Sequence, residues 1–268
     1  MRFGHEQALD DQMSRRSRLK YKYLGDSHAG RLLRFLWLAH DTGPFLEGRN
    51  LRILEVGSNT GSFVFWLARR SPGSRVCGLE IDREMASRSA RINERLGLAN
   101  AHFMAGDITT PALKPGFDLV YCIDVLEHIA DDDLALANIH GLLAEGGRFI
   151  LQFPPKIRKQ SRWDVEGGHV GLGYTREELL EKIEAAGFHI ERVERATGIW
   201  GAIGYLIDVT LTLFLRLRFP ITLPFIPFIL AFVRLDPLLT RKRRFGGFVV
   251  TALRGRSDPG VDGTGVKG

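Results

Sequence analysis

Short apolar runs alternate with stretches of helical spacing from residue 51 to residue 193. The short runs are rich in Val, Ile and Leu, whereas the longer stretches repeat their apolar positions every three to four residues. This alternation predicts a doubly wound, mostly parallel α/β sheet, because parallel neighbouring strands need a crossover, usually a helix, between them. The predicted strands are 51–56, 75–80, 101–105, 117–123, 147–153 and 188–193, and the predicted helices are 62–70, 83–96, 131–143 and 175–187.

The two ends of the chain depart from this alternation. A basic stretch, 15–22, precedes an apolar segment at 32–39 that reads as a helix, and Thr42-Gly43-Pro44 is expected to end that helix. After residue 198 the chain is strongly apolar up to Val233, and a basic run and one last strand follow. We therefore expect an amino-terminal helical cap (1–48), an α/β domain (49–198), an apolar and basic helical insertion (199–244), a last strand (245–254) and a disordered tail (255–268).

Composition narrows the class of protein. The 268 residues are 44% hydrophobic and 25% charged, which is ordinary for a globular chain and excludes disordered and collagen-like classes. Two cysteines, Cys77 and Cys122, are too few for a structural zinc site, so no metal is expected. The first twenty residues lack the apolar core of a secretory signal, which favours a cytoplasmic setting.

The net charge of +6 is unevenly distributed. Residues 51–200 carry a net −3, whereas residues 1–50 carry +3 and residues 201–268 carry +6. A basic groove for nucleic acid across the main domain is therefore not expected. The positive charge instead flanks the apolar insertion and the amino-terminal cap.

The loop after the first strand carries a ligand-binding pattern. Gly57 and Gly61 let the backbone turn sharply, and the helix that follows presents its free N–H groups to a ligand. The spacing differs from the dinucleotide fingerprint, and no P-loop lysine is present. An NAD-dependent oxidoreductase is therefore disfavoured.

Acidic residues lie in or just after successive strands. Glu55 lies in the first strand, Glu80 ends the second, and Asp107 and Asp124 follow the third and fourth. Ligands of such sheets bind beyond the carboxyl ends of the strands, and a carboxylate there accepts hydrogen bonds from ribose hydroxyls. Four acidic side chains around one crevice favour a cationic, ribose-bearing ligand over a polyphosphate.

The runs 54–61, 78–82, 106–108 and 117–129 together resemble the class I S-adenosylmethionine-dependent methyltransferases, and 169–179 with 186–188 resembles the group that contains quinone methyltransferases. The resemblance implies a Rossmann-like, seven-stranded sheet with an antiparallel last strand, and S-adenosylmethionine as cofactor. It implies that the glycine loop holds the methionine part, Glu80 the ribose and Asp107 the adenine. Ser58-Asn59 replaces the family's usual Cys-Gly but keeps the loop small and polar. The expected cofactor-binding residues are Glu55, Gly57, Ser58, Asn59, Gly61, Glu80, Ile81, Asp107, Ile108 and Ile123.

Methyl transfer from a sulfonium is an in-line displacement that needs a base only when the acceptor must lose a proton. Asp124 and His128 are expected at the reacting end, with His169 as a further catalytic candidate. Each histidine could act as a base or serve a structural role. The amide and aromatic motif of DNA amino-methyltransferases is absent after the fourth strand, which disfavours nucleobase methylation.

The insertion is apolar but short for a membrane span. Residues 199–215 would span about 26 Å as a helix, less than the ~30 Å hydrocarbon core. Prolines interrupt the next apolar stretch, 219–233. Asp208, Thr212 and Arg216 form a narrow polar stripe, and basic residues border the segment. This pattern predicts contact with an anionic membrane surface at the inner face. The alternative is a lid that packs on its own domain or on a second copy of the chain.

The sequence thus predicts a methyltransferase for a lipophilic small molecule, such as a quinone, an isoprenoid or a lipid precursor. Two alternatives stay open. The first is a methyltransferase for a soluble polar acceptor, such as a sugar or natural product. The second is a non-catalytic, membrane-associated scaffold with the same fold. The sequence does not distinguish O-, N- and C-methylation.

Overall fold

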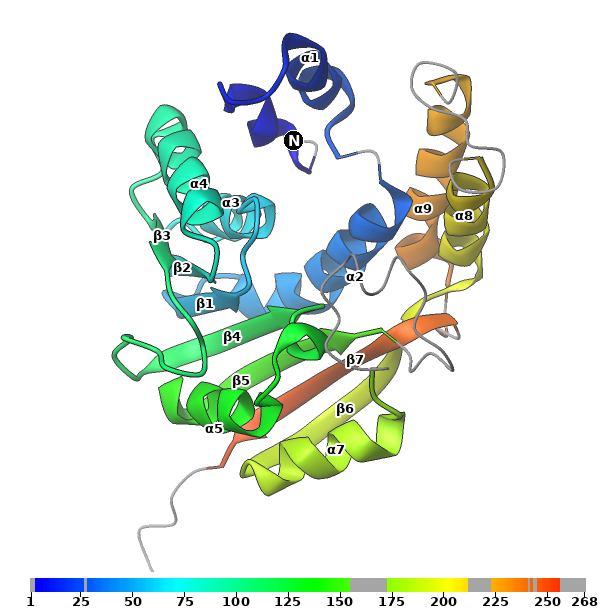
Figure 1. The fold of residues 1–268 in the computed structure, drawn as a ribbon. Coiled ribbons are helices and arrows are strands. Elements are labelled where there is room, and N and C mark those ends of the chain that lie inside the picture. The colour runs from blue at the N-terminus through cyan, green and yellow to red at the C-terminus, as the bar shows by residue number, and fades with distance from the viewer. Residues whose placement is uncertain are drawn as a thin grey trace, which may run out of the picture.

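A seven-stranded sheet forms the centre of the molecule (Figure 1). The computed structural model describes residues 3–26, 28–154, 173–211, 223–240, 242 and 245–255. The strand order is β3-β2-β1-β4-β5-β7-β6; β1 to β5 pair in parallel, and β7 runs antiparallel to both β5 and β6. The strands are β1 (Arg52–Val56), β2 (Arg75–Glu80), β3 (Ala101–Ala105), β4 (Phe117–Ile123), β5 (Leu143–Phe153), β6 (Phe188–Thr197) and β7 (Phe245–Arg254). The predicted mostly parallel sheet with an antiparallel last strand is confirmed.

Helices cover both faces of the sheet. Helices α2, α3 and α4 lie on one side and α5 and α7 on the other (Figure 1). The α-helices are α1 (Arg15–Leu24), α2 (Ala29–Leu46), α3 (Ser62–Arg70), α4 (Arg83–Leu96), α5 (Asp132–Leu142), α7 (Arg176–Ala185), α8 (Ile199–Val209) and α9 (Ile226–Leu239). Short 3₁₀ helices are η1 (His5–Leu9), η2 (Leu126–His128) and η4 (Leu223–Phe225).

Local signals fix several helix ends where the sequence predicts them. The Asp82 carboxylate accepts hydrogen bonds from the N–H groups of Glu84 and Met85 and so begins α4. Gly97 ends the same helix in the left-handed conformation. Thr175 and Glu178 form the predicted capping box of α7. These ends depend on neighbouring residues alone, which is why they are readable from sequence.

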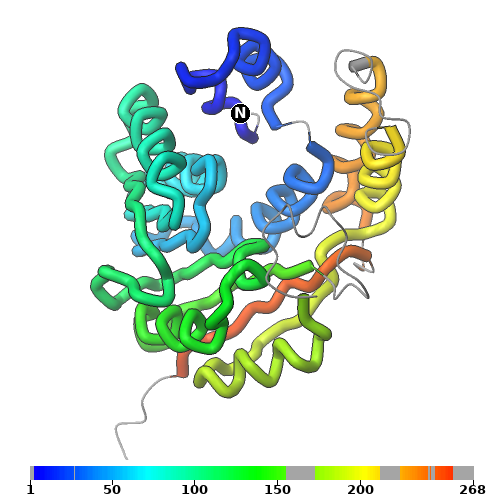
Figure 2. Tube along the Cα trace, viewed as in Figure 1, coloured from blue at the N-terminus to red at the C-terminus, as the bar shows by residue number. Residues whose placement is uncertain are grey.

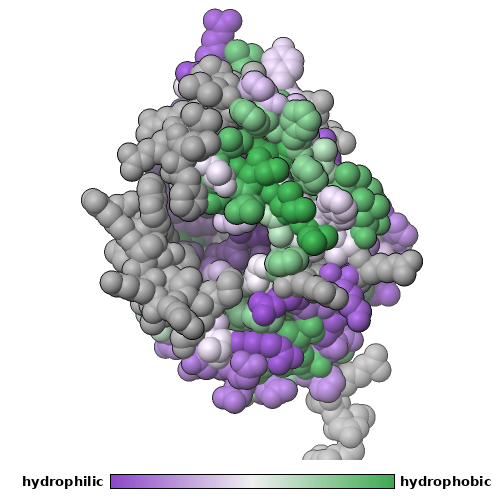
Figure 3. Space-filling model, turned by 90° about the vertical axis from the view of Figure 1, so that its right-hand side faces the viewer, coloured by the Kyte–Doolittle hydropathy of each residue, from purple (hydrophilic) through white to green (hydrophobic). Residues whose placement is uncertain are grey.

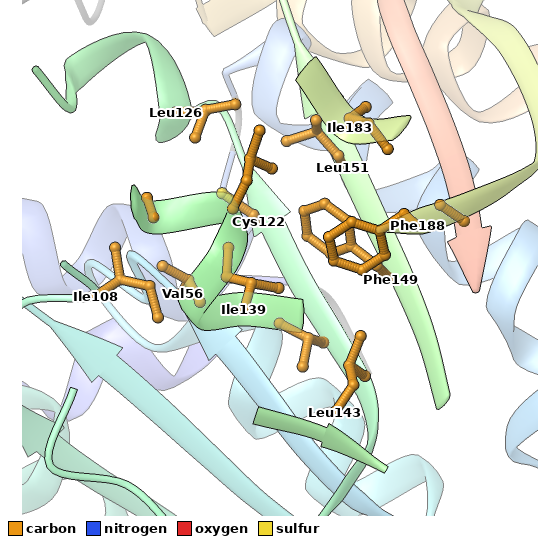
Figure 4. Close-up of a cluster of buried hydrophobic side chains, with 14 of the residues drawn as sticks. Val56, Ile108, Cys122, Leu126, Ile139, Leu143, Phe149, Leu151, Ile183 and Phe188 are labelled. Carbon is orange, nitrogen blue, oxygen red and sulfur yellow. The ribbon is translucent and has the colours of Figure 1, made fainter. Parts of the chain in front are cut away.

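The core has one layer on each face of the sheet. Side chains that alternate along β4 and β5 point in opposite directions, toward α5 and α7 or toward α2 and α3. Figure 4 shows the first layer, in which Cys122, Phe149 and Leu151 of the strands meet Ile139 and Ile183 of the helices. Both cysteines are free thiols, and burial raises the pKa of Cys77 to about 11.

Helix α2 runs past its predicted end. Thr42-Gly43-Pro44 lies inside the helix, which continues to Leu46. Pro44 lacks only one backbone donor, and the Thr42 hydroxyl donates 2.6 Å to the Leu38 carbonyl in the preceding turn. Leu46 is buried against α3 and the sheet. Tertiary packing therefore outweighs the local stop signal.

The insertion is a helical hairpin that packs on the amino-terminal cap. Apolar residues of α8 and α9 form one buried cluster with Ala29, Leu32 and Leu33 of α2. Asp208, the first residue of the predicted polar stripe, accepts from the Ala29 N–H at 3.1 Å and so caps α2. Thr212 and Arg216, the rest of that stripe, lie outside the described residues. Within the described ranges, no helix is long and apolar enough to cross a membrane.

A buried aspartate joins the hairpin to the sheet. Asp236 of α9 is fully buried and accepts hydrogen bonds of 2.8–2.9 Å from Trp37, Thr197, Gly198 and Thr240. Burial alone would raise the pKa of Asp236, but hydrogen bonds from the Gly201 and Gly198 N–H groups and from Trp37 hold it below its usual value. A charged aspartate thus connects α2, β6, α8 and α9.

Candidate functional site

The carboxyl ends of four parallel strands meet at one edge of the sheet. β1 lies between β2 and β4, and β3 pairs with β2. This order brings the ends of β1, β2, β3 and β4 together, and the predicted cofactor-binding residues lie in these four strands or in the loops just after them. The sequence prediction and the topology therefore select the same edge of the sheet.

The loop between β1 and α3 turns at its two glycines. Gly57 and Gly61 have φ values of 72° and 73°, in the left-handed region. A Cβ at position 57 would lie 2.3 Å from Val125 Cγ2, and one at position 61 would lie 2.6 Å from Phe103 Cε1. Asn59 also has a positive φ, of 44°. The loop is therefore tightly wound, and its glycines are required both by conformation and by space.

Glu80 connects this loop to the end of β2. Its carboxylate accepts from the Asn59 N–H at 2.7 Å and from the Asp82 N–H at 3.1 Å. A carboxylate offers about four acceptor positions, so two of them stay available to neighbouring hydroxyl groups. This capacity fits the ribose of a nucleoside, which the sequence assigns to Glu80.

Glu55 and Ser58 are buried beside the same loop. Burial raises the pKa of Glu55 well above its usual value, and the nearby charge of Glu80 adds to the rise despite a hydrogen bond from the Val64 N–H. Neither Glu55 Oε2 nor the Ser58 hydroxyl has a hydrogen-bond partner among the described residues. Burial of Glu55 therefore opposes its negative charge, in contrast to what the acidic pattern of the sequence suggests for this position.

The other four predicted cofactor-binding residues have different environments. Asp107, at the end of β3, accepts from the Thr109 N–H at 2.8 Å, and its side chain is half-buried. Ile81 is 71% exposed directly after Glu80, so it offers a free apolar face. Ile108 is buried in the core, and its carbonyl accepts from Asn138 at 2.9 Å, so its side chain supports the fold. Ile123 is half-buried against the α2 and α3 layer.

Asp124 forms an ion pair with a residue of the amino-terminal cap. Its φ is 51°, unusual for a non-glycine residue, and its N–H donates 3.0 Å to the Gln152 carbonyl. Its carboxylate lies 2.8 Å from the Arg34 guanidinium of α2. Sequence reasoning missed Arg34, because this residue is far from Asp124 along the chain and no local pattern marks it.

The two histidines predicted at the reacting end have different outcomes. His128 ends η2 and is exposed, four residues after Asp124. His169 lies outside the described residues. The structure therefore places Asp124 and His128 beyond the end of β4 and says nothing of His169.

Glu127 is a buried carboxyl group that the sequence predictions did not include. Burial raises its pKa to about 7, and the charge of Asp124 adds to the rise, while a backbone hydrogen bond and Arg34 act in the other direction. Its Oε2 has no hydrogen-bond partner among the residues described. The run 117–129 contains Glu127, but only the tertiary structure separates a buried glutamate from an exposed one.

No cluster of three or more His, Cys, Asp or Glu side chains that could hold a metal ion occurs in the described part of the chain. The polar groups at the strand ends are carboxyl groups and backbone N–H groups of a tight loop, and one exposed apolar side chain, Ile81, lies beside them. These groups fit a ligand with a ribose, an apolar ring and a positive charge.

Part of this chain is similar to known methyltransferases. Residues 54–149 match the family described as "Methyltransferase domain". The chain is 32% identical over 120 residues to a demethylmenaquinone methyltransferase of Thermus thermophilus, and the match covers 44% of this chain and 54% of that relative. The chain thus spans about half the length of this curated relative.

Solved structures share the fold at low identity. The [4+2]-cyclase SpnF has a TM-score of 0.59 at 20% identity, over 82% of each chain. Geranyl diphosphate C-methyltransferase of Streptomyces coelicolor, solved with S-adenosylhomocysteine, has a TM-score of 0.57 at 15% identity, over 81% of this chain and 80% of that one. These likenesses concern the architecture alone.

Proposed function

We infer that this chain, whose residues 54–149 match a methyltransferase domain family, is a class I S-adenosylmethionine-dependent methyltransferase that moves a methyl group from S-adenosylmethionine to a lipophilic small molecule. A quinone, an isoprenoid or a lipid precursor is the acceptor class we propose, at or near a membrane surface. The likeness to a demethylmenaquinone methyltransferase supports a quinone-type acceptor. The exposed apolar hairpin of α8 and α9 is the structural observation that carries the lipophilic assignment.

The residues at the strand ends fit the cofactor. Glu80 would accept from the ribose hydroxyls, Ile81 would cover the adenine ring, and Asp107 would accept from the exocyclic amine of adenine. The tightly wound loop at 57–61 would hold the methionine part with its N–H groups. The cofactor supplies an electrophilic methyl group, so the chain itself mainly orients the acceptor and excludes water.

Asp124 and His128 are the residues we propose at the reacting end. The Arg34 ion pair holds the Asp124 carboxylate, and the side chain of the next residue, Val125, lies against Gly57 of the glycine loop. His128 is the candidate base if the acceptor is a hydroxyl that loses its proton during transfer. Alternatively, His128 only forms part of the wall of the acceptor site. The dependence of activity on pH, compared between the wild-type chain and His128→Gln, separates the two roles.

The hairpin exposes an unusual amount of apolar side chain. Leu206, Phe228 and Leu238 are 63%, 66% and 78% exposed. The view from this side shows hydrophobic residues gathered over the hairpin (Figure 3). Because soluble monomers rarely keep large contiguous apolar patches, such a surface marks a contact with membrane, ligand or protein. Exposed Arg234 and Lys242 lie near it in the sequence, which favours an anionic membrane.

The acceptor is tested by incubating the chain with methyl-labelled S-adenosylmethionine and a total lipid extract. We expect label in the organic phase, and no label with the Glu80→Ala variant, which loses the proposed ribose contact. The binding of S-adenosylhomocysteine is measured in parallel for the wild-type chain and for Glu80→Ala. Label that enters only water-soluble products would favour the polar-acceptor alternative. Absence of cofactor binding by the wild-type chain would overturn the enzyme assignment in favour of a scaffold.

A further inference from the structure

The first residues of the chain reach the cofactor loop. Residues 3–13, which we call the amino-terminal arm, contain η1, and η1 contacts both α3 and α4. The arm lies above the space between these helices and α2 (Figure 2). It therefore lies beside the two helices that begin directly after the glycine loop and just after Glu80.

Gln7 makes the contact with the loop itself. Its side chain is buried, and its Nε2 donates 2.8 Å to the Thr60 carbonyl and 3.3 Å to the Ser62 hydroxyl. Thr60 belongs to the glycine loop, and Ser62 is the first residue of α3. The amide thus bridges both sides of Gly61, the left-handed residue at which the loop becomes a helix.

Two buried acidic residues hold the arm on either side of Gln7. Glu6 lies 3.5 Å from Arg69 of α3, and Asp10 forms an ion pair with Arg88 of α4. Both carboxyl groups are almost fully buried. Because buried ion pairs require close geometry, these contacts fix the register of the arm and so the place of Gln7.

The arm also contacts the opposite side of the crevice. The Phe3 ring stacks on Phe35 of α2 at 4.0 Å between centroids, and the Phe3 carbonyl accepts from the Asp26 N–H at 2.8 Å. The neighbouring residue Arg34 holds Asp124. The arm therefore connects the helices on the cofactor side to the cap helix whose arginine pairs with the proposed reacting end.

We propose that Gln7 is a positioning residue for the cofactor loop, so that docking of the arm and binding of S-adenosylmethionine favour each other. Gly57 and Gly61 leave the free loop many conformations, and the Gln7 amide selects the one in which Thr60 and Ser62 face the arm. Coupling of this kind is reciprocal, so the bound cofactor must also stabilise the docked arm. The inference rests on cofactor binding at this loop, as in the proposed function.

The test compares Gln7→Ala and Gln7→Glu with Gln12→Ala as the matched control. Gln12 lies on the same arm but has an exposed side chain, and its backbone N–H donates to the Asp10 carboxylate. Calorimetry with S-adenosylhomocysteine is expected to show about ten-fold weaker binding for both Gln7 variants and no change for Gln12→Ala. In turnover, KM for S-adenosylmethionine rises while kcat at saturation stays unchanged.

The Gln7→Glu variant separates donation from packing. A glutamate keeps the length of the side chain but, when ionised, offers no donor to the Thr60 carbonyl. The affinity of Gln7→Glu for S-adenosylhomocysteine, measured relative to that of the wild-type chain at each pH, should recover partly as the pH falls, because the carboxyl group gains a proton. Absence of that recovery would contradict the assigned donor role.

Hydrogen exchange of residues 3–13 tests the reciprocal effect. S-adenosylhomocysteine should slow exchange in the arm of the wild-type chain, and less so in Gln7→Ala. The proposal is overturned if the arm of Gln7→Ala exchanges fast while cofactor affinity equals that of wild type. A wild-type chain that binds no cofactor would instead refute the proposed function, so the two failures are distinguishable.

Discussion

Glu127 shows how one buried carboxyl group can set a dependence on pH. Its pKa in the folded chain is about 7, against an ordinary value of 4.5, chiefly because the side chain is buried and secondly because Asp124 is near. Below pH 4.5 the group is protonated in both the folded and the unfolded chain. Between 4.5 and 7 the unfolded chain ionises first, so the free energy of unfolding falls as the pH rises.

We predict that Glu127→Gln removes this loss of stability. The variant should gain on the order of 3 kcal/mol in free energy of unfolding relative to wild type between pH 4 and pH 8, because glutamine does not ionise. Urea unfolding of both proteins at the two pH values measures the difference. Glu94→Gln, at an exposed position of α4, is the control and should show no such change. If the difference in free energy of unfolding between Glu127→Gln and wild type is the same at pH 4 and pH 8, the raised pKa assigned to Glu127 is contradicted.

The place of several predicted site residues in the fold was readable from sequence, while their part in cofactor binding stays a prediction. Gly57, Gly61 and Glu80 lie where the pattern of strands and loops predicts, because each follows directly from the end of a strand. The raised pKa of Glu55 was not readable, since it depends on burial and on the nearby charge of Glu80. Arg34 and Gln7 were likewise missed, because their partners lie far away along the chain.

At the scale of elements, Asp236 decides how the hairpin is attached. One carboxylate accepts from Trp37 of α2, Thr197 of β6 and the Gly198 N–H at the start of α8. Gly201 of α8 leaves room for it, because a Cβ there would lie 2.6 Å from Asp236 Oδ2. The predicted insertion contains two acidic residues, Asp208 and Asp236, and only packing revealed that Asp236 is central to the junction.

We predict that Asp236→Ala lowers the free energy of unfolding by about 3 kcal/mol or more, because it leaves buried donors of Trp37 and Thr197 without an acceptor. Denaturant unfolding measures the loss. The control is Asp133→Ala, whose carboxylate pairs with Lys182 but is 72% exposed, and which should cost less than about 1 kcal/mol. Similar losses in the two variants would refute the central role of Asp236.

At the scale of the whole molecule, the apolar hairpin and the proposed cofactor site share the cap helix α2. The apolar cluster of α8 and α9 buries one face of α2, while Arg34 of the same helix pairs with Asp124. A lipophilic acceptor bound at the hairpin surface would thus lie near α2, the helix whose Arg34 pairs with Asp124 at the proposed reacting end. Because the two sites are linked through α2, we expect the molecule that binds at the hairpin surface to be the acceptor of the methyl group.

We predict that the double variant Leu206→Ser, Phe228→Ser binds vesicles of anionic phospholipid at least about ten-fold more weakly than wild type, because two exposed apolar side chains no longer enter the interface. Co-sedimentation with vesicles measures the binding. Leu134→Ser is the control, since Leu134 is an exposed leucine on α5, away from the hairpin (Figure 1). The surface is a subunit interface instead if the wild-type chain does not bind the vesicles but sediments as a dimer, and the double variant sediments as a monomer.

The sequence alone determined the elements of the sheet and most helix ends, and it predicts the cofactor edge, because these depend on periodicity, caps and loops within a few residues. The tertiary structure decided what distant segments do together: the course of α2 past Pro44, the capping of α2 by Asp208, and the contact of Gln7 with Thr60. Such contacts join residues that are far apart in sequence and buried on folding. Their energies depend on packing and desolvation, which no local pattern of residues records.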